Sequence, residues 1–227
     1  MSHIQPAPSN QRCITVAFFL QRFCNASNST IGACPLLYYL CNAMDGKITL
    51  RRATVADARF IAENVLRALH IDETDERHIE HLAAISRRED TLYSWRNATI
   101  ALYDGVPAGL MVTYDGARYR QMRDITFPMI RMYVGDDYHQ MDDEASPGEY
   151  YLDSLAVLPQ YQHKGIASAL IKEMFRQRDE AGIPLATIAV DPDNDTAYRL
   201  YTRHGFRHDG QISVFGTTYH RLVHRYC

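Results

Sequence analysis

The sequence has no long hydrophobic run. Its longest apolar stretch near the start, Ile14–Leu20, spans seven residues, well short of the roughly 18 that a membrane span needs. Arg12 and Arg22 flank this stretch as in the core of a secretory signal, but no convincing small-residue cleavage site follows closely. We therefore expect neither a membrane partner nor export.

Cysteine is nearly absent from most of the chain. Four of the five cysteines lie before residue 46 and the fifth is Cys227, and their spacings form no C-x-x-C pair. The ten histidines show no H-E-x-x-H spacing, so the sequence indicates neither a zinc site nor a redox motif, and we expect no metal. A reduced, cytoplasmic protein fits this cysteine usage best.

Basic charge is not in excess, and two familiar nucleotide-binding loops are missing. The net charge of −3 and the isoelectric point near 6.3 argue against a dedicated nucleic-acid binder. The order Lys164-Gly165 does not fit G-x-x-x-x-G-K-S/T, and no G-x-G-x-x-G occurs. The sequence thus excludes a P-loop and a dinucleotide fingerprint.

The chain divides near residue 46. Residues 1–46 mix Asn, Ser, Pro and Cys without a sustained period, and we expect an irregular extension there. Residues 47–227 are patterned and long enough for one catalytic domain. Met44 stands directly before the transition, so two hypotheses stay open: the natural start lies at Met44, or the first segment is a flexible or partner-binding arm.

Hydrophobic periodicity predicts the elements of the second part. Thr54 and Asp57 form a capping-box-like start for a helix whose apolar residues share one face up to Leu69. Asp104-Gly105 is a hairpin turn signal. The expected strands are 48–51, 98–103, 108–114, 150–157, 185–190, 206–215 and 218–224, and the further helices are 75–87, 119–133, 165–181 and 195–204. Strands 150–157 and 185–190 flank a crossover helix, which predicts that they are parallel.

The loop 157–167 joins the first of these parallel strands to its helix and has the features of an anion site. The first N–H groups of a helix lack partners and point into such a loop with the positive end of the helix dipole. Gly165 allows close approach of the backbone, Ala167 keeps the next turn thin, and Lys164 adds positive charge. These residues predict a pyrophosphate site, with an ordinary strand-to-helix loop as the alternative.

Two segments together resemble the signatures of the GCN5-related N-acetyltransferases (GNAT). Gln162-x-x-Gly165-x-Ala167 is similar to the family's Q/R-x-x-G-x-G/A motif, and the preceding residues 155–159, LAVLP, are similar to its L-A-V-x-P strand. Downstream, Asn194–Phe206 resembles the N-x-x-A-x-x-L-Y-x-x-x-G-F segment. The likeness covers about residues 48–226 by order of elements and is most specific in these two segments.

The resemblance implies an α/β (α+β) fold with a mixed, mostly antiparallel sheet of six or seven strands, splayed between two central parallel strands and flanked by helices. It implies acetyl-CoA as co-substrate, with the pantetheine arm bonded to strand backbone like an added strand and the pyrophosphate on the loop amides. Asn194 would meet a pantetheine amide or act as a plain helix cap. The implied cofactor-binding residues are Leu155, Ala156, Val157, Gln162, His163, Lys164, Gly165, Ile166, Ala167, Ser168, Asn194 and Tyr201.

Tyr201 and Asp153 are the candidate catalytic residues. In the family the tyrosine equivalent to Tyr201 faces the sulfur, where a phenol with a pKa of about 10 can donate to the departing thiolate; a core aromatic is the alternative. An amine with a pKa of about 10.4 needs a base. Asp153, two residues before Leu155, would share its face of the strand and serve as base or ammonium anchor, or be a polar residue satisfied by backbone.

The predicted function is N-acetyltransfer from acetyl-CoA to a primary amine of a small molecule. The resemblance implies direct transfer from a ternary complex, the usual mechanism of the family, and Cys227, which is terminal, is a poor nucleophile candidate. Acetylation of a protein or peptide, and a non-catalytic acyl-CoA sensor, are the alternatives. The acidic stretch 136–144 would favour a cationic acceptor if it lines the site, although such runs are often solvated loops. Homodimerisation is left open.

Overall fold

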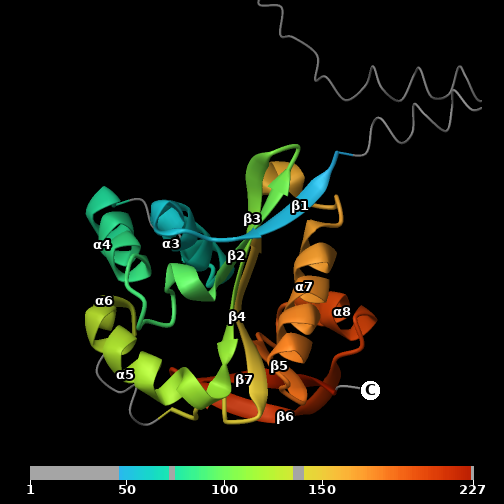
Figure 1. Cartoon of the computed structure of the whole chain (residues 1–227). Coiled ribbons are helices and arrows are strands. Elements are labelled where there is room, and N and C mark those ends of the chain that lie inside the picture. The colour runs from blue at the N-terminus through green and yellow to red at the C-terminus, as the bar shows by residue number, and fades with distance from the viewer. Residues whose placement is uncertain (1–45, 72–74, 135–140, 226–227) are drawn as a thin grey trace, which may run out of the picture. The chain divides into compact units, whose positions relative to one another are not determined.

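The computed structural model describes residues 46–71, 75–134 and 141–225. The expected extension over 1–46, apart from Gly46, and the hypotheses about Met44 lie outside these residues. The elements, labelled as in Figure 1, are β1 (Ile48–Arg52), α3 (Ala58–Ala68), α4 (Glu76–Ser86), β2 (Ala98–Tyr103), β3 (Val106–Asp115), α5 (Tyr119–Met129), α6 (Arg131–Val134), β4 (Glu149–Val157), α7 (Ile166–Glu180), β5 (Leu185–Val190), α8 (Asp195–Arg203), β6 (Arg207–Val214) and β7 (Thr217–Arg225).

These elements confirm the order and type predicted from periodicity, except that the single helix expected over 119–133 is divided into α5 and α6. Asp57 accepts hydrogen bonds from the backbone N–H and the hydroxyl of Thr54 at 2.8 and 2.9 Å, which fixes the entry to α3 as the capping pattern indicated. Both residues of the Asp104-Gly105 turn have positive φ, 51° and 81°, as a tight hairpin requires. Among the described residues, no helix is both long and apolar enough to cross a bilayer.

The seven strands form one mixed sheet in the order β1-β2-β3-β4-β5-β7-β6. Every neighbouring pair is antiparallel except β4 and β5, which are parallel. The strand-helix-strand crossover through α7 produces this single parallel pair. The structure thus confirms the expected mixed and mostly antiparallel sheet.

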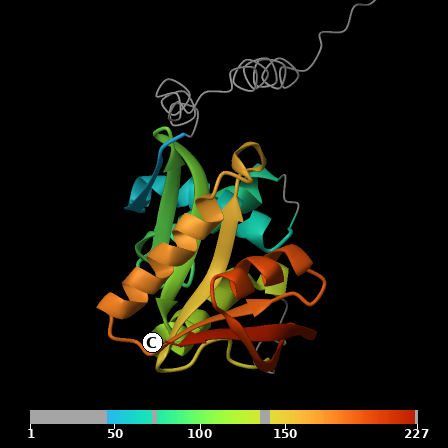
Figure 2. The same ribbon diagram turned by 90° about the vertical axis from the view of Figure 1, so that its right-hand side faces the viewer.

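The two parallel strands pair over only part of their length. Their ladder runs from Glu149 opposite Leu185 to Tyr151 opposite Thr187, although β4 continues to Val157. Figure 2 shows the two strands running apart beyond this point. The second half of β4 therefore has an edge facing β5 that no strand covers.

Helices cover both faces of the sheet (Figure 1). On one face α3, α4 and α5 pack over a core that includes Ile61, Leu82 and Phe127. On the other face the core beneath α7 and α8 includes Leu170 and Tyr201. The gap between β4 and β5 is thus flanked by α7 and α8 on one side and by α3 on the other.

The pairing of β4 with β3 is irregular at Asp153. Val112 pairs with Ser154 and Thr113 pairs with Leu152, so Asp153 is the extra residue of a β-bulge. A bulge leaves one residue outside the ladder and interrupts the alternation of sides along the strand. The expectation that Asp153 shares the face of Leu155 by simple alternation is therefore wrong.

Candidate active site

The loop before α7 presents backbone donors. His163 and Gly165 both have positive φ, 60° and 83°, and Gly165 stands at the helix N-cap without a side-chain capping bond. Its carbonyl accepts the first helical hydrogen bond, from Ala169 N–H at 3.0 Å. The N–H groups of Ile166, Ala167 and Ser168 therefore have no acceptor within the helix, and they are suited to an anion.

A cavity of about 490 Å³, here called the loop cavity, opens at these donors. The loop residues Gln162, His163 and Gly165 form one wall and α8 forms the other. The loop cavity also reaches Val157 at the end of β4. The backbone groups predicted to bind a pyrophosphate thus lie around one hollow.

The positive charge at the loop cavity comes from a residue that the sequence analysis missed. The ammonium of Lys164 lies 4.8 Å from the centre of the Tyr103 ring, and Lys164 does not line the cavity. Arg203 of α8 lines it instead and makes no ion pair with another described residue. Thr196, Leu200 and Arg203 are spaced i, i+4, i+7, a helical face that could have revealed this arginine.

Ser168 of the loop region lies against α8. Its hydroxyl is 3.0 Å from Nε2 of His204. Burial, with Lys172 and Arg203 nearby, lowers the pKa of His204, which favours the neutral ring. This contact ties the first turn of α7 to the end of α8 beside the loop cavity.

The uncovered half of β4 directs two residues toward the gap. The N–H of Leu158 donates to the carbonyl of Ala108 in β3 at 2.9 Å. Because backbone groups alternate along a strand, Ala156 also directs its N–H and C=O to β3. Leu155 and Val157 direct theirs to the uncovered edge. Ala156, predicted with them as a cofactor-binding residue, does not line the loop cavity.

A second cavity of about 250 Å³, here called the transfer cavity, lies in the gap itself. Asp153 and Leu155 line it from β4, residues 188–190 from β5, Asp191 and Asn194 from the loop that follows, and Ala197 and Tyr201 from α8. Leu69 and His70 close it from the end of α3. The fold therefore brings both predicted catalytic residues to one cavity.

Tyr201 is 5% exposed, and its ring packs edge-on against Phe206 with ring centres 5.7 Å apart. Its hydroxyl makes no hydrogen bond with another described residue. Burial raises the pKa of Tyr201 above its ordinary value. The hydroxyl thus keeps its proton and is available to donate into the transfer cavity.

Asp153 is held by two hydroxyls. Tyr114 donates to one carboxylate oxygen and Ser154 to the other, each at 2.8 Å. Burial raises the pKa of Asp153, and these two hydrogen bonds partly oppose the rise. Tyr114 belongs to the core beneath α3, whereas Leu155 packs on the α7 side, as the bulge permits.

A second carboxylate, Glu144, lies close to this group. Tyr151 and Tyr119 donate to its two oxygens at 2.9 and 3.2 Å. Burial and the charge of Asp153 raise the pKa of Glu144 to about 7. Asp136 and Asp137, of the acidic stretch 136–144, lie outside the described residues, while Asp143 pairs with Arg123 at 2.6 Å. Only Glu144, among the described acidic residues of that stretch, turns toward the tyrosines.

Asn194 is a helix cap. Its side-chain oxygen accepts from the N–H of Ala197 at 3.0 Å, and the residue also lines the transfer cavity. The oxygen is therefore engaged, and the side-chain NH₂ is the group left for a ligand.

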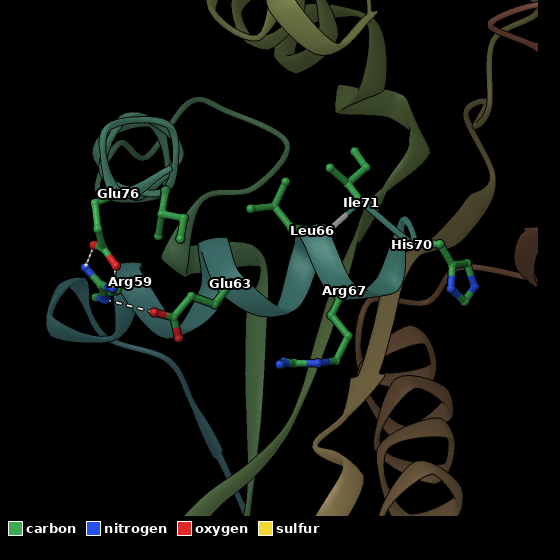
Figure 3. Close-up of a pocket in the computed structure, with 8 residues that line it drawn as sticks. Arg59, Glu63, Leu66, Arg67, His70, Ile71 and Glu76 are labelled. Atoms are coloured by element: carbon green, nitrogen blue, oxygen red, sulfur yellow. Dashed lines mark hydrogen bonds and ion pairs between the residues drawn. The ribbon is translucent and has the colours of Figure 1, made fainter. Parts of the chain in front are cut away.

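A further hollow of about 530 Å³ lies between α3 and α4. Figure 3 shows Arg59 there between Glu63 and Glu76, with ion pairs of 2.8 and 2.9 Å. Arg67 donates to Asn64 at 2.8 Å. Because Arg59, Glu63 and Glu76 are paired with one another and no strand residue is among the described residues that line the hollow, it lacks the features of a transfer site.

Comparison with known proteins agrees with the family resemblance seen in the sequence. The model of the acetyltransferase (GNAT) family matches residues 62–206. A GCN5-like protein acetyltransferase of Mycobacterium tuberculosis is 35% identical over 57 residues, which are 25% of this chain and 28% of that protein. The match therefore spans less than a third of the curated relative.

Two solved structures share the fold. An N-acetyltransferase from Staphylococcus aureus Mu50 superposes with a TM-score of 0.65 and 21% identity, covering 78% of this chain and 100% of that one. The PaiA N-acetyltransferase of Thermoplasma acidophilum, solved in complex with coenzyme A, has a TM-score of 0.50 and 16% identity over 79% and 99%. The family match covers more than half of the chain, and the sheet has the expected parallel pair, so this chain belongs to the acetyltransferase (GNAT) family.

Proposed function

We propose that the protein transfers an acetyl group from acetyl-CoA directly to a primary amine of a small molecule. The observation that carries this proposal is the transfer cavity, because a carboxylate, Asp153, and a proton-bearing phenol, Tyr201, line it together. Transfer to an amine needs a group on each side of the reacting carbon: one that takes a proton from nitrogen and one that donates to sulfur.

The residues around the gap fit coenzyme A. The uncovered backbone of Leu155 and Val157 suits the two amide groups of a pantetheine arm, which would bond there like an added strand. The uncapped amides of Gly165–Ser168 suit the pyrophosphate, and the guanidinium of Arg203 adds charge beside them. When bound, acetyl-CoA supplies the acetyl group as a thioester.

Asp153 acts on the incoming amine. Its carboxylate attracts the ammonium form and, directly or through water, takes a proton so that the neutral amine can attack. Burial raises the pKa of Asp153, which makes its carboxylate a stronger base than an exposed one. Tyr114 and Ser154 hold both oxygens and so fix its direction.

Tyr201 acts on the sulfur. A thiol has an ordinary pKa of about 8.5, below that of the buried phenol. Tyr201 therefore stabilises the departing thiolate by donating a hydrogen bond more than by giving up its proton for good. The N–C bond forms as the C–S bond breaks, and sulfur takes the electron pair. Two protons leave the ammonium nitrogen in total. One protonates the thiolate to give the free thiol of CoA, and the other goes to solvent.

Release of CoA from acetyl-CoA, measured against a panel of small amines and of peptides with free N-termini, tests this function. We expect amine-dependent release that saturates with a small amine. Efficient release only with peptides would favour a protein or peptide acetyltransferase. Saturable binding of acetyl-CoA without transfer to any acceptor would indicate a sensor and contradict the proposal.

A further inference from the structure

A third cavity, about 190 Å³ in volume and here called the apolar cavity, adjoins the transfer cavity. It lies on the α3 side of the sheet, and Leu69 and Tyr219 line both cavities. Its walls come from α3, α4 and α5 and from the β6–β7 hairpin, and nearly all of its lining side chains are apolar or aromatic. A ligand in this cavity would therefore reach the transfer cavity without crossing the core.

One charged side chain lines the apolar cavity. It is Glu144, the acidic residue among the described lining residues. Tyr119 and Tyr151 hold it, and the ring of Tyr114, which holds Asp153, packs 6.3 and 5.7 Å from their rings. The two carboxylates are thus neighbours, one in each cavity, at the place where the cavities meet. That place suits a single ammonium group.

The mouth of the apolar cavity carries two exposed hydrophobic side chains. Leu69 is 47% exposed and Phe215 is 44% exposed. Phe215 also has a φ of 50°, a conformation that a bulky residue rarely adopts and that has a cost in folding energy. Its ring packs against Phe127 with centres 5.4 Å apart. The two-residue hairpin turn Phe215-Gly216, with φ of 50° and 76°, requires this backbone conformation. It does not require an aromatic side chain, and an aromatic ring exposed at a cavity mouth suits contact with a ligand.

We propose that the apolar cavity is the acceptor site and that it takes a primary amine with one ammonium group and an apolar body about the size of one ring. Glu144 and Asp153 receive the ammonium group, and the body lies among Leu66, Leu82, Phe127 and Phe215. This inference rests on the proposed function and narrows its substrate class.

Size and charge favour this class over two others. An apolar cavity of about 150 Å³ in another protein holds benzene, so this one accommodates a ring and not an extended peptide. A diamine would place its second ammonium among apolar walls, because the described residues that line the apolar cavity include no second carboxylate, and burying such a charge unpaired is strongly unfavourable.

The test is the steady-state kinetics of the full chain with acetyl-CoA and three acceptors: 2-phenylethylamine, 1,4-diaminobutane and a peptide with a free N-terminus. We expect kcat/KM for 2-phenylethylamine to exceed the other two values by at least roughly tenfold, the discrimination that a hydrophobic pocket provides. Comparable values for all three, or a preference for the diamine or the peptide, would overturn the substrate class while leaving acetyltransfer in place. No CoA release with any acceptor would overturn the proposed function as well.

Two variants locate the site. Phe215→Ala should raise the KM for 2-phenylethylamine several-fold and leave the KM for acetyl-CoA unchanged, whereas Val106→Ala, at an apolar residue that is 50% exposed in β3 away from all three cavities, should change neither. Glu144→Gln keeps the shape of the side chain and should also raise the amine KM. Unchanged amine KM values in both cavity variants, with cooperative unfolding retained, would contradict the assignment.

Discussion

The two sides of the β4–β5 gap differ in whether backbone groups or side chains form the site. On the α7 side the predicted coenzyme site is made largely of backbone: an uncovered strand edge and an uncapped helix N-terminus with Gly165 at φ 83°. On the α3 side the proposed acceptor site is made of side chains, with Glu144 and Asp153 held by tyrosine hydroxyls. Backbone groups suit the pantetheine amides and the pyrophosphate, which are the same in every coenzyme A thioester. Side chains at the acceptor site determine which amine can bind.

Tyr201 stands where the two sides meet, and its removal should have the largest effect. Tyr201→Phe keeps the ring but deletes the donor to sulfur, so we expect kcat to fall by roughly 100-fold, the size of a typical acid contribution. The KM for acetyl-CoA should change little. Tyr198→Phe, on the same helix with its ring 5.7 Å from His220, is the matched control and should leave kcat unchanged. Equal rates in both variants across the pH range would remove Tyr201 from the mechanism.

Substitution of Asp153 tests the role of the side chains on the α3 side of the gap. Asp153→Asn cannot accept the proton, so we expect kcat/KM for the amine to fall by tens of fold. In the unmodified protein burial raises the pKa of Asp153, so the active carboxylate is lost as pH falls through that raised value. The acidic limb of the kcat/KM profile should lie above the ordinary pKa of an aspartate, about 3.9. An acidic limb that persists unchanged in Asp153→Asn would assign the base to another group.

Substitution of Gly165 tests the role of the backbone amides on the α7 side of the gap. A Cβ at Gly165 would meet only Ile48, at 3.9 Å, and φ is 83°; Gly182 also has positive φ, 66°, and open space. Alanine at either position imposes a similar strain of about 1 kcal/mol. Gly165→Ala should in addition displace the loop amides and weaken acetyl-CoA binding about tenfold, since charge-assisted hydrogen bonds contribute on the order of 1.5–3 kcal/mol each. Calorimetry that finds equal affinities in the two variants would mean that the loop does not bind the pyrophosphate.

The titration of Glu144 should affect the stability of the fold. Burial and Asp153 raise its pKa from 4.5 to about 7 in the folded protein, so the folded state binds the proton more tightly. The associated stability is present below about pH 4.5 and is lost as pH rises through about 7. We expect the free energy of unfolding to fall as pH rises over this window, as measured by urea denaturation.

The decrease in the free energy of unfolding with rising pH should be smaller in Glu144→Gln. Glu80→Gln serves as the control, because Arg87 lowers the pKa of the exposed Glu80, so its own linkage has the opposite sign. An unchanged slope in Glu144→Gln would show that Glu144 does not titrate in this range.

The sequence predicts the α7 side better than the α3 side. Gly165, the loop before α7 and Tyr201 lie within segments whose local spacing carries the information. The parallel pairing of β4 and β5 follows from the crossover, whereas their splaying was implied by the family resemblance. Asn194 shows the limit of such motifs, since its oxygen caps α8 through Ala197. Pattern alone did not decide between cap and ligand.

The α3 side depends on contacts between distant residues. Glu144 meets Tyr119, 25 residues away, and Asp153 meets Tyr114, 39 residues away. The local periodicity of the sequence does not predict contacts between residues so far apart. In addition, a single bulge at Asp153 places its side chain on the opposite face of the sheet from the one that simple alternation predicts. Arg203 was missed because the charge was sought in the loop, at Lys164, and not on the facing helix.

Initial-velocity kinetics with acetyl-CoA and 2-phenylethylamine both varied test the central claim most directly. If Asp153 and Tyr201 act on both substrates together in the gap between β4 and β5, double-reciprocal lines should intersect, as a ternary complex requires. Parallel lines, or acetyl-CoA cleavage that does not depend on the amine, would contradict direct transfer in this cavity.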